Sequence, residues 1–138
     1  MRTIREIIIH CSATPEGRDY SIETIRRWHI QRGFADIGYH YIIHPDGTVE
    51  HGRNELSIGA HCKGHNANSI GICYIGGTDT DGKTPKDTRT PQQKGAMRGL
   101  VRTLMNRYNL TPQAVHGHNE FANKACPCFN VKQWRTQL

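Results

Sequence analysis

The feature that most constrains the fold is a run of three isoleucines, Ile7-Ile8-Ile9, that ends abruptly in His10. A half-exposed strand alternates apolar and polar residues, whereas a continuous apolar run is typical of a strand buried on both faces. Residues 3–10 are therefore predicted to form a central strand. Such a strand needs covering layers on both faces, which is the arrangement of a three-layer α/β domain.

Two segments carry the signals of substantial helices. Ser21 can cap a helix that runs to about Arg32, with Gly33 as its stop. Residues 90–93, Thr-Pro-Gln-Gln, form a capping box with proline at the first helical position, and this helix is predicted to reach Tyr108. The apolar residues expected to face the sheet are Ile22, Ile25 and Trp28 in the first helix and Met97, Leu100, Val101, Leu104 and Met105 in the second.

Further strand patterns complete a mixed sheet flanked by helices. The Asp-Gly pair at 46–47 is a strong hairpin signal. The remaining predicted segments are a strand at 39–44, its return at 48–51, a strand at 69–75, a short strand at 114–117, polar loops at 52–68 and 76–89, and a short last helix begun by Asn130. The length of 138 residues suits one domain with a sizeable core, so we expect residues 1–138 to form a single domain.

The amino-acid composition limits which binding partners and which cellular compartment are expected for this protein. The net charge of +6 favours an anionic partner such as nucleic acid or an acidic wall polymer, but the basic residues are scattered, which a solvated basic surface explains equally well. No apolar stretch approaches a membrane span, and no secretory segment begins the chain. Five irregularly spaced cysteines argue against a disulfide framework and favour a reducing compartment.

Three distant residues have the character of one metal site. His10 closes the central strand, His118 follows the short strand at 114–117, and Cys126 lies in a later loop. Ends of neighbouring strands converge at one edge of a sheet, where α/β folds place their sites. Two imidazoles and a thiolate suit zinc, and three protein ligands leave one position for water. We therefore expect one zinc ion per chain at one edge of the sheet, in a catalytic rather than a structural site.

Six short motifs occur in a familiar order and spacing. They are His10-Cys11-Ser12-Ala13-Thr14, Gly38-Tyr39-His40-Tyr41, Asp46-Gly47-Thr48-Val49-Glu50, Asn68-Ser69-Ile70-Gly71-Ile72, His118-Asn119-Glu120 and Lys124-Ala125-Cys126-Pro127. Together they resemble the type 2 zinc amidases: phage lysozyme-type N-acetylmuramoyl-L-alanine amidases, bacterial relatives and animal peptidoglycan recognition proteins. The similarity is closest to the phage enzymes and spans roughly residues 5–135.

This resemblance implies an activity and assigns roles. It implies zinc bound by His10, His118 and Cys126, and cleavage of the amide between N-acetylmuramic acid and L-alanine of the peptidoglycan stem peptide. It places Tyr39 and Lys124 on the family's catalytic tyrosine and lysine. His116 precedes the ligand position by two and does not match it.

Residue chemistry is compatible with those two catalytic roles. If the segment before Cys126 is extended, Lys124 projects to the same side as the cysteine, where its ammonium can stabilise an oxyanion. The phenol of Tyr39 can orient water or bind the carbonyl oxygen. Strand alternation puts Tyr39 and His40 on opposite faces, so we assign Tyr39 to the zinc side and His40 to the other. A surface lysine and a packed core tyrosine are the alternatives.

Other residues receive weaker assignments. By the same resemblance His61 matches a segment that lines the substrate groove, and Lys63 and Asn66 are further candidates for substrate binding. Cys11 follows a ligand on a strand end and should point away from it as a buried thiol. Cys128 is treated as a non-ligand, although it is close enough in sequence to compete for the metal.

Three alternatives stay open: a cysteine hydrolase that uses Cys126 with His118 as base, a non-catalytic peptidoglycan-binding module, and a nucleic-acid-binding domain with structural zinc. Our main hypothesis is a zinc-dependent peptidoglycan amidase of the endolysin type.

 Such an enzyme would be made in the cytoplasm without a signal peptide and act on the cell wall after release. We expect a monomer that binds muramyl peptides, with no nucleic-acid partner and no membrane insertion.

Overall fold

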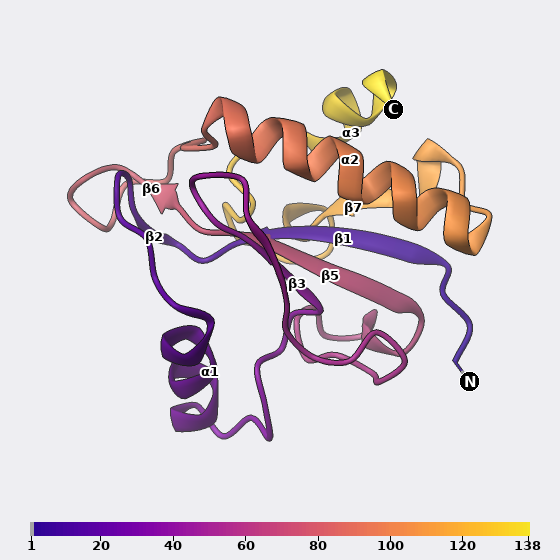
Figure 1. Ribbon diagram of the computed structural model, residues 1–138, viewed down its shortest axis with the longest axis horizontal. Helices are drawn as coiled ribbons and strands as arrows, with labels where there is room; N and C mark the ends of the chain where they lie inside the picture. Colours follow the sequence, from indigo (N-terminus) through magenta and orange to yellow (C-terminus); the bar gives the residue numbers. More distant parts are fainter. Residues whose placement is uncertain (1) are drawn as a thin grey trace.

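The central layer is a five-stranded mixed sheet with the order β4-β3-β5-β1-β7 (Figure 1). The structure is a computed structural model, and it describes residues 2–138. β1 (Glu6–Cys11) lies between β5 (Ser69–Tyr74) and β7 (Val115–Gly117) and is parallel to both. β3 (Tyr41–Ile43) is parallel to β5, and β4 (Val49–His51) runs antiparallel beside β3. The predicted mixed sheet is therefore confirmed.

The isoleucine run forms the buried centre of this sheet, as predicted. Ile7, Ile8 and Ile9 are each 0% exposed. Ile7, Ile9 and Cys11 belong to one apolar cluster with the buried residues of the long helix. Because side chains alternate along a strand, His10 points to the opposite face of the sheet.

Helices cover both faces of the sheet, which confirms the three layers (Figure 1). α1 (Ile22–Gln31) lies on one face, and α2 (Pro91–Tyr108) and α3 (Val131–Trp134) lie on the other. The Ser21 side chain caps α1 by accepting from the Thr24 amide. No helix within residues 2–138 has both the length and the apolar character that a membrane crossing requires.

The start of α2 is tied to the sheet by a buried glutamine. Thr90 and Gln93 form the predicted capping box. Gln93 is 0% exposed, and its Nε2 donates to the carbonyls of Ile43 at 3.2 Å and Ile75 at 3.0 Å. The Thr90 hydroxyl donates to the Pro45 carbonyl at 2.6 Å. One side chain thus joins the helix cap to the ends of β3 and β5.

The structure differs from the predicted elements in the starts of two strands and in several short elements. The first strand begins at Glu6 rather than at residue 3, and the second begins at Tyr41 rather than at residue 39. The loop at 76–89 contains β6 (Gly77–Thr78), which pairs with β2 (Thr14–Pro15) in a small second sheet. Strands of two residues are too short to leave a periodic pattern. The four 3₁₀ turns, also unpredicted, are η1 (Asn66–Asn68), η2 (Pro112–Ala114), η3 (His118–Glu120) and η4 (Arg135–Gln137).

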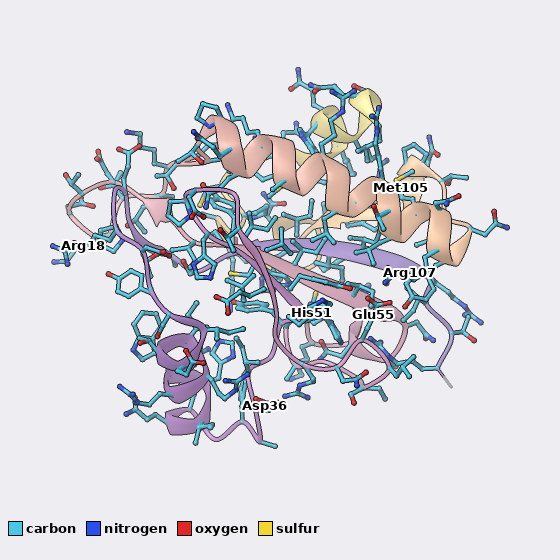
Figure 2. All side chains as sticks on the ribbon, in the orientation of Figure 1. Arg18, Asp36, His51, Glu55, Met105 and Arg107 are labelled. Atoms are coloured by element: carbon cyan, nitrogen blue, oxygen red, sulfur yellow. The ribbon has the colours of Figure 1, made fainter. Side chains whose placement is uncertain are left out.

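A partly buried carboxylate joins the far end of α2 to the loop after β4. Glu55 accepts hydrogen bonds from the hydroxyls of Tyr41 and Tyr108. It also pairs with Arg107, whose Nη1 lies 2.8 Å from its Oε1 (Figure 2). These contacts anchor the loop after β4, which leads along the chain toward His61.

Replacing Gln93 by alanine should lower the free energy of unfolding by about 1–3 kcal/mol, because the buried Ile75 carbonyl loses its donor. Urea unfolding measures this change. The exposed neighbour provides the control: Gln92→Ala should unfold at nearly the wild-type midpoint. Equal midpoints for the two variants would contradict the role given to Gln93.

Candidate metal centre and active site

His10, His118 and Cys126 come together at the carboxyl ends of β1 and β7. Their ligand atoms all lie within 4.8 Å of one another. His10 is 1% exposed, while His118 and Cys126 are partly buried. The group therefore forms at the expected end of the sheet, with one ligand in the strand and two in the segment that follows β7.

The three donors fit a metal ion in both spacing and chemistry. In a tetrahedral zinc site with bonds of about 2.0–2.3 Å, two ligand atoms lie roughly 3.5 Å apart. His10 Nδ1 and Cys126 Sγ are separated by 3.8 Å. The backbone amide of Cys11 lies 3.2 Å from the same sulfur and donates to it.

The two neighbouring thiols lie outside this group. Cys11 is 4% exposed and belongs to the core cluster, as predicted for a thiol that points away from His10. Cys128 Sγ lies 3.9 Å from Cys11 Sγ and donates to the Gly77 carbonyl at 3.2 Å. This position agrees with its prediction as a non-ligand.

Tyr39 stands beside the first ligand. Its ring centroid is 5.1 Å from that of His10. Burial raises the pKa of the Tyr39 phenol well above its usual value, so it stays protonated and can donate a hydrogen bond. His40 points elsewhere: its Nδ1 accepts from the Gly71 amide at 3.0 Å.

Lys124 lines the same cavity and is exposed. Burial lowers the pKa of His118, and the nearby positive charge of Lys124 lowers it further. The segment before Cys126 is bent rather than extended, so the geometric reason predicted for this proximity is wrong although the lysine faces the cavity.

A cavity of about 710 Å³ surrounds the ligand group. Among residues 2–138, none of its lining side chains is acidic, and Arg32, Lys63 and Lys124 bring positive charge to it. The volume is that of an ordinary ligand pocket. The cavity therefore suits an anionic ligand of moderate size.

The residues predicted to bind substrate, His61, Lys63 and Asn66, all line this cavity. Lys63 is exposed to it. Asn66 Oδ1 accepts from the amides of His61 and Cys62, both at 2.9 Å, so this oxygen holds the loop. Their role in substrate binding stays a prediction.

Two residues near His118 have structural contacts. Glu120 Oε2 accepts from the Gly117 amide at 2.7 Å, which caps the 3₁₀ turn. Its other oxygen lies 2.9 Å from His116 Nδ1. His116 is thereby paired away from the ligand group, as its position in the sequence predicted.

The sequence reasoning missed His29, which also lines the cavity. It is 5% exposed, and its ring lies 5.2 Å from that of Tyr39. Its Nδ1 accepts from the Gly38 amide at 2.8 Å. A usable signal existed, because His29 follows Ile25 by four residues on the buried face of α1.

His29 should make stability fall in acid. Burial, assisted by Arg32 and Arg53, lowers its pKa from 6.5 to about 4. A lowered folded-state pKa gives stability that is complete above about pH 6.5 and is lost as the pH falls toward 4, because the unfolded chain binds the proton first.

The matched variant is His29→Asn, which keeps an acceptor for the Gly38 amide but does not titrate. Between pH 6.5 and 4 its free energy of unfolding should fall less steeply than that of wild type, by up to about 1.4 kcal/mol per pH unit. Urea unfolding at several pH values measures both slopes. Parallel curves would show that His29 does not change its protonation on unfolding.

Comparison with known proteins identifies the family. The N-acetylmuramoyl-L-alanine amidase family matches residues 1–129. The endolysin of Enterobacteria phage T3 is 45% identical over 132 residues, which cover 96% of this chain and 85% of the relative. Peptidoglycan-recognition protein SC2 of Drosophila melanogaster is 32% identical over 112 residues, covering 80% of this chain and 58% of that protein.

Solved structures agree with this match. The endolysin amidase LysCS from Clostridium intestinale superposes with a TM-score of 0.81 at 31% identity, covering 98% of this chain and 85% of that one. Drosophila PGRP-LB gives a TM-score of 0.75 at 27% identity over 92% of this chain and 76% of its own. The chain therefore belongs to the N-acetylmuramoyl-L-alanine amidase family and is a peptidoglycan amidase.

Proposed function

We propose that this amidase depends on zinc held by His10, His118 and Cys126, and that it cuts the amide between N-acetylmuramic acid and L-alanine. The observation that carries the proposal is the convergence of two imidazoles and one thiol within 4.8 Å beside a cavity. Three such ligands are typical of catalytic zinc, since a structural site is closed by four. The chemistry that bound zinc supplies is Lewis acidity, which activates water and polarises a carbonyl.

Tyr39 is proposed to position the reacting groups. Its ring lies against His10, and its phenol stays protonated at neutral pH because burial raises its pKa. A fixed O–H donor at this point can bind the amide carbonyl oxygen or hold the attacking water.

Lys124 is proposed to stabilise the charge that develops in the reaction. Attack on an amide carbonyl produces an oxyanion, and a cation placed beside it lowers the energy of the transition state. Lys124 lies near enough to His10 and His118 for its charge to lower the pKa of both rings, alongside the larger effect of burial.

The charge of the cavity supports a peptidoglycan stem peptide as the ligand. Such peptides carry free carboxylates, and the cavity is lined by Arg32, Lys63 and Lys124. Lys63 and Asn66 also line the cavity, and we propose that they contact the peptide beyond the scissile bond. A cavity of this kind without the three metal ligands would suit the alternative, a non-catalytic peptidoglycan-binding protein.

We further propose an endolysin role: synthesis in the cytoplasm, then action on the wall after release. The support is the similarity to phage endolysins over nearly the whole chain. The protein is proposed to act as a monomer with one zinc ion.

Digestion of purified peptidoglycan tests the bond and the metal together. Mass spectrometry should show released stem peptides that begin with L-alanine. A strong chelator should abolish their release, and added zinc should restore it. A cysteine hydrolase that uses Cys126 and His118 would keep its activity in chelator, so full activity there contradicts the proposal.

Variants separate metal binding from chemistry. Tyr39→Phe and Lys124→Ala should keep about one zinc per chain and lose activity by about 100-fold or more. Cys126→Ala should lose the metal, and Cys128→Ser should keep it. Metal analysis and peptide release measure these outcomes, with the exposed Lys132→Ala as the matched lysine control. A Cys128→Ser variant without zinc would show that the site is closed by a fourth ligand.

A further inference from the structure

We propose that His61 is a positioning residue for His10 and that it fixes, through a buried hydrogen-bond relay, the tautomer in which His10 binds metal. The inference rests on the proposed zinc site and replaces substrate binding as the main role of His61. The relay is the three-residue chain His10–His61–Ser69, whose members are 1%, 8% and 0% exposed.

Distances define the direction of the relay. His10 Nδ1 faces Cys126 Sγ, while His10 Nε2 lies 2.8 Å from His61 Nδ1. A nitrogen that binds a metal must offer its lone pair, so the proton of His10 belongs on Nε2 and is donated to His61. His61 then carries its own proton on Nε2, which lies 3.1 Å from Ser69 Oγ and can donate to it.

The same atoms allow the opposite order. If the Ser69 hydroxyl donates to His61 Nε2, then His61 Nδ1 donates to His10 Nε2, and His10 must carry its proton on Nδ1. That arrangement leaves no lone pair for the metal. The direction of the hydrogen bond at the buried Ser69 hydroxyl is therefore coupled to whether His10 has a lone pair free to bind the metal.

The fold builds a slot for the His61 ring. A Cβ added at Gly71 of β5 would lie 2.6 Å from His61 Cγ, and one added at Gly59 would lie 2.8 Å from His61 Cδ2. Asn66 holds the backbone of His61 in place by accepting a hydrogen bond from its amide at 2.9 Å. A ring enclosed in this way has little freedom to turn toward a substrate.

The identity of the acceptor has a chemical consequence. A ligating histidine usually donates its second N–H to a carboxylate, a carbonyl or water. Here the acceptor is the His61 imidazole nitrogen, 2.8 Å from His10 Nε2, rather than a carboxylate. The relay orients His10 without adding negative charge, which preserves the Lewis acidity of the proposed site.

Two variants separate hydrogen bonding from packing. His61→Asn keeps an acceptor, since Asn Oδ1 occupies the place of His Nδ1, whereas His61→Leu keeps volume without an acceptor. Competition with a chromogenic chelator should show zinc binding weakened about 10- to 100-fold in His61→Leu and much less in His61→Asn. The exposed Lys132→Ala should bind zinc as wild type does.

Nitrogen-15 NMR of the zinc-loaded wild type gives a readout that needs no variant. It should find the proton of His10 on Nε2 and that of His61 also on Nε2. A proton on His61 Nδ1, or an unchanged zinc affinity with a raised KM in His61→Leu, would overturn the relay. Wild-type protein that binds no zinc would instead refute the proposed function, so the two failures are distinguishable.

Discussion

The parallel pairing of β1 with β5 and β7 is the constraint on which the site depends. It brings the carboxyl ends of β1 and β7 to one level, so that His10 and the residue after Gly117 lie side by side. Alternation along β1 then sends Ile9 and Cys11 into the core and His10 to the face covered by α1. A slip of one residue would exchange these faces and place a ligand in the apolar cluster.

Buried histidines line the proposed metal site or lie directly behind it, as His40 does. Burial lowers the pKa of His10, His29, His40 and His61. Backbone amides donate to Nδ1 of His29 and of His40, and the relay fixes the other two rings. The positive charge that lines the cavity comes from Arg32, Lys63 and Lys124.

Local signals predicted much of this architecture. The isoleucine run, the Ser21 and Thr90 caps and the Asp-Gly turn each report on neighbouring residues, and the structure agrees with them. Placement at strand ends and the family motifs distinguish His10 and His118 from the other seven of the nine histidines. The bond from His10 to His61 joins residues 51 positions apart, and no periodicity predicts a contact of that kind. The same is true of the hydrogen bonds to Glu55 and of the β2–β6 pair.

The central claim is a zinc site with three protein ligands and one open position. X-ray absorption at the zinc edge of the purified protein tests it most directly, because it counts sulfur and nitrogen neighbours separately. The account predicts one sulfur, two imidazole nitrogens and one further light atom from water. Two sulfurs would mean that Cys128 joins Cys126 at the metal, and a closed site of that kind would contradict the catalytic role.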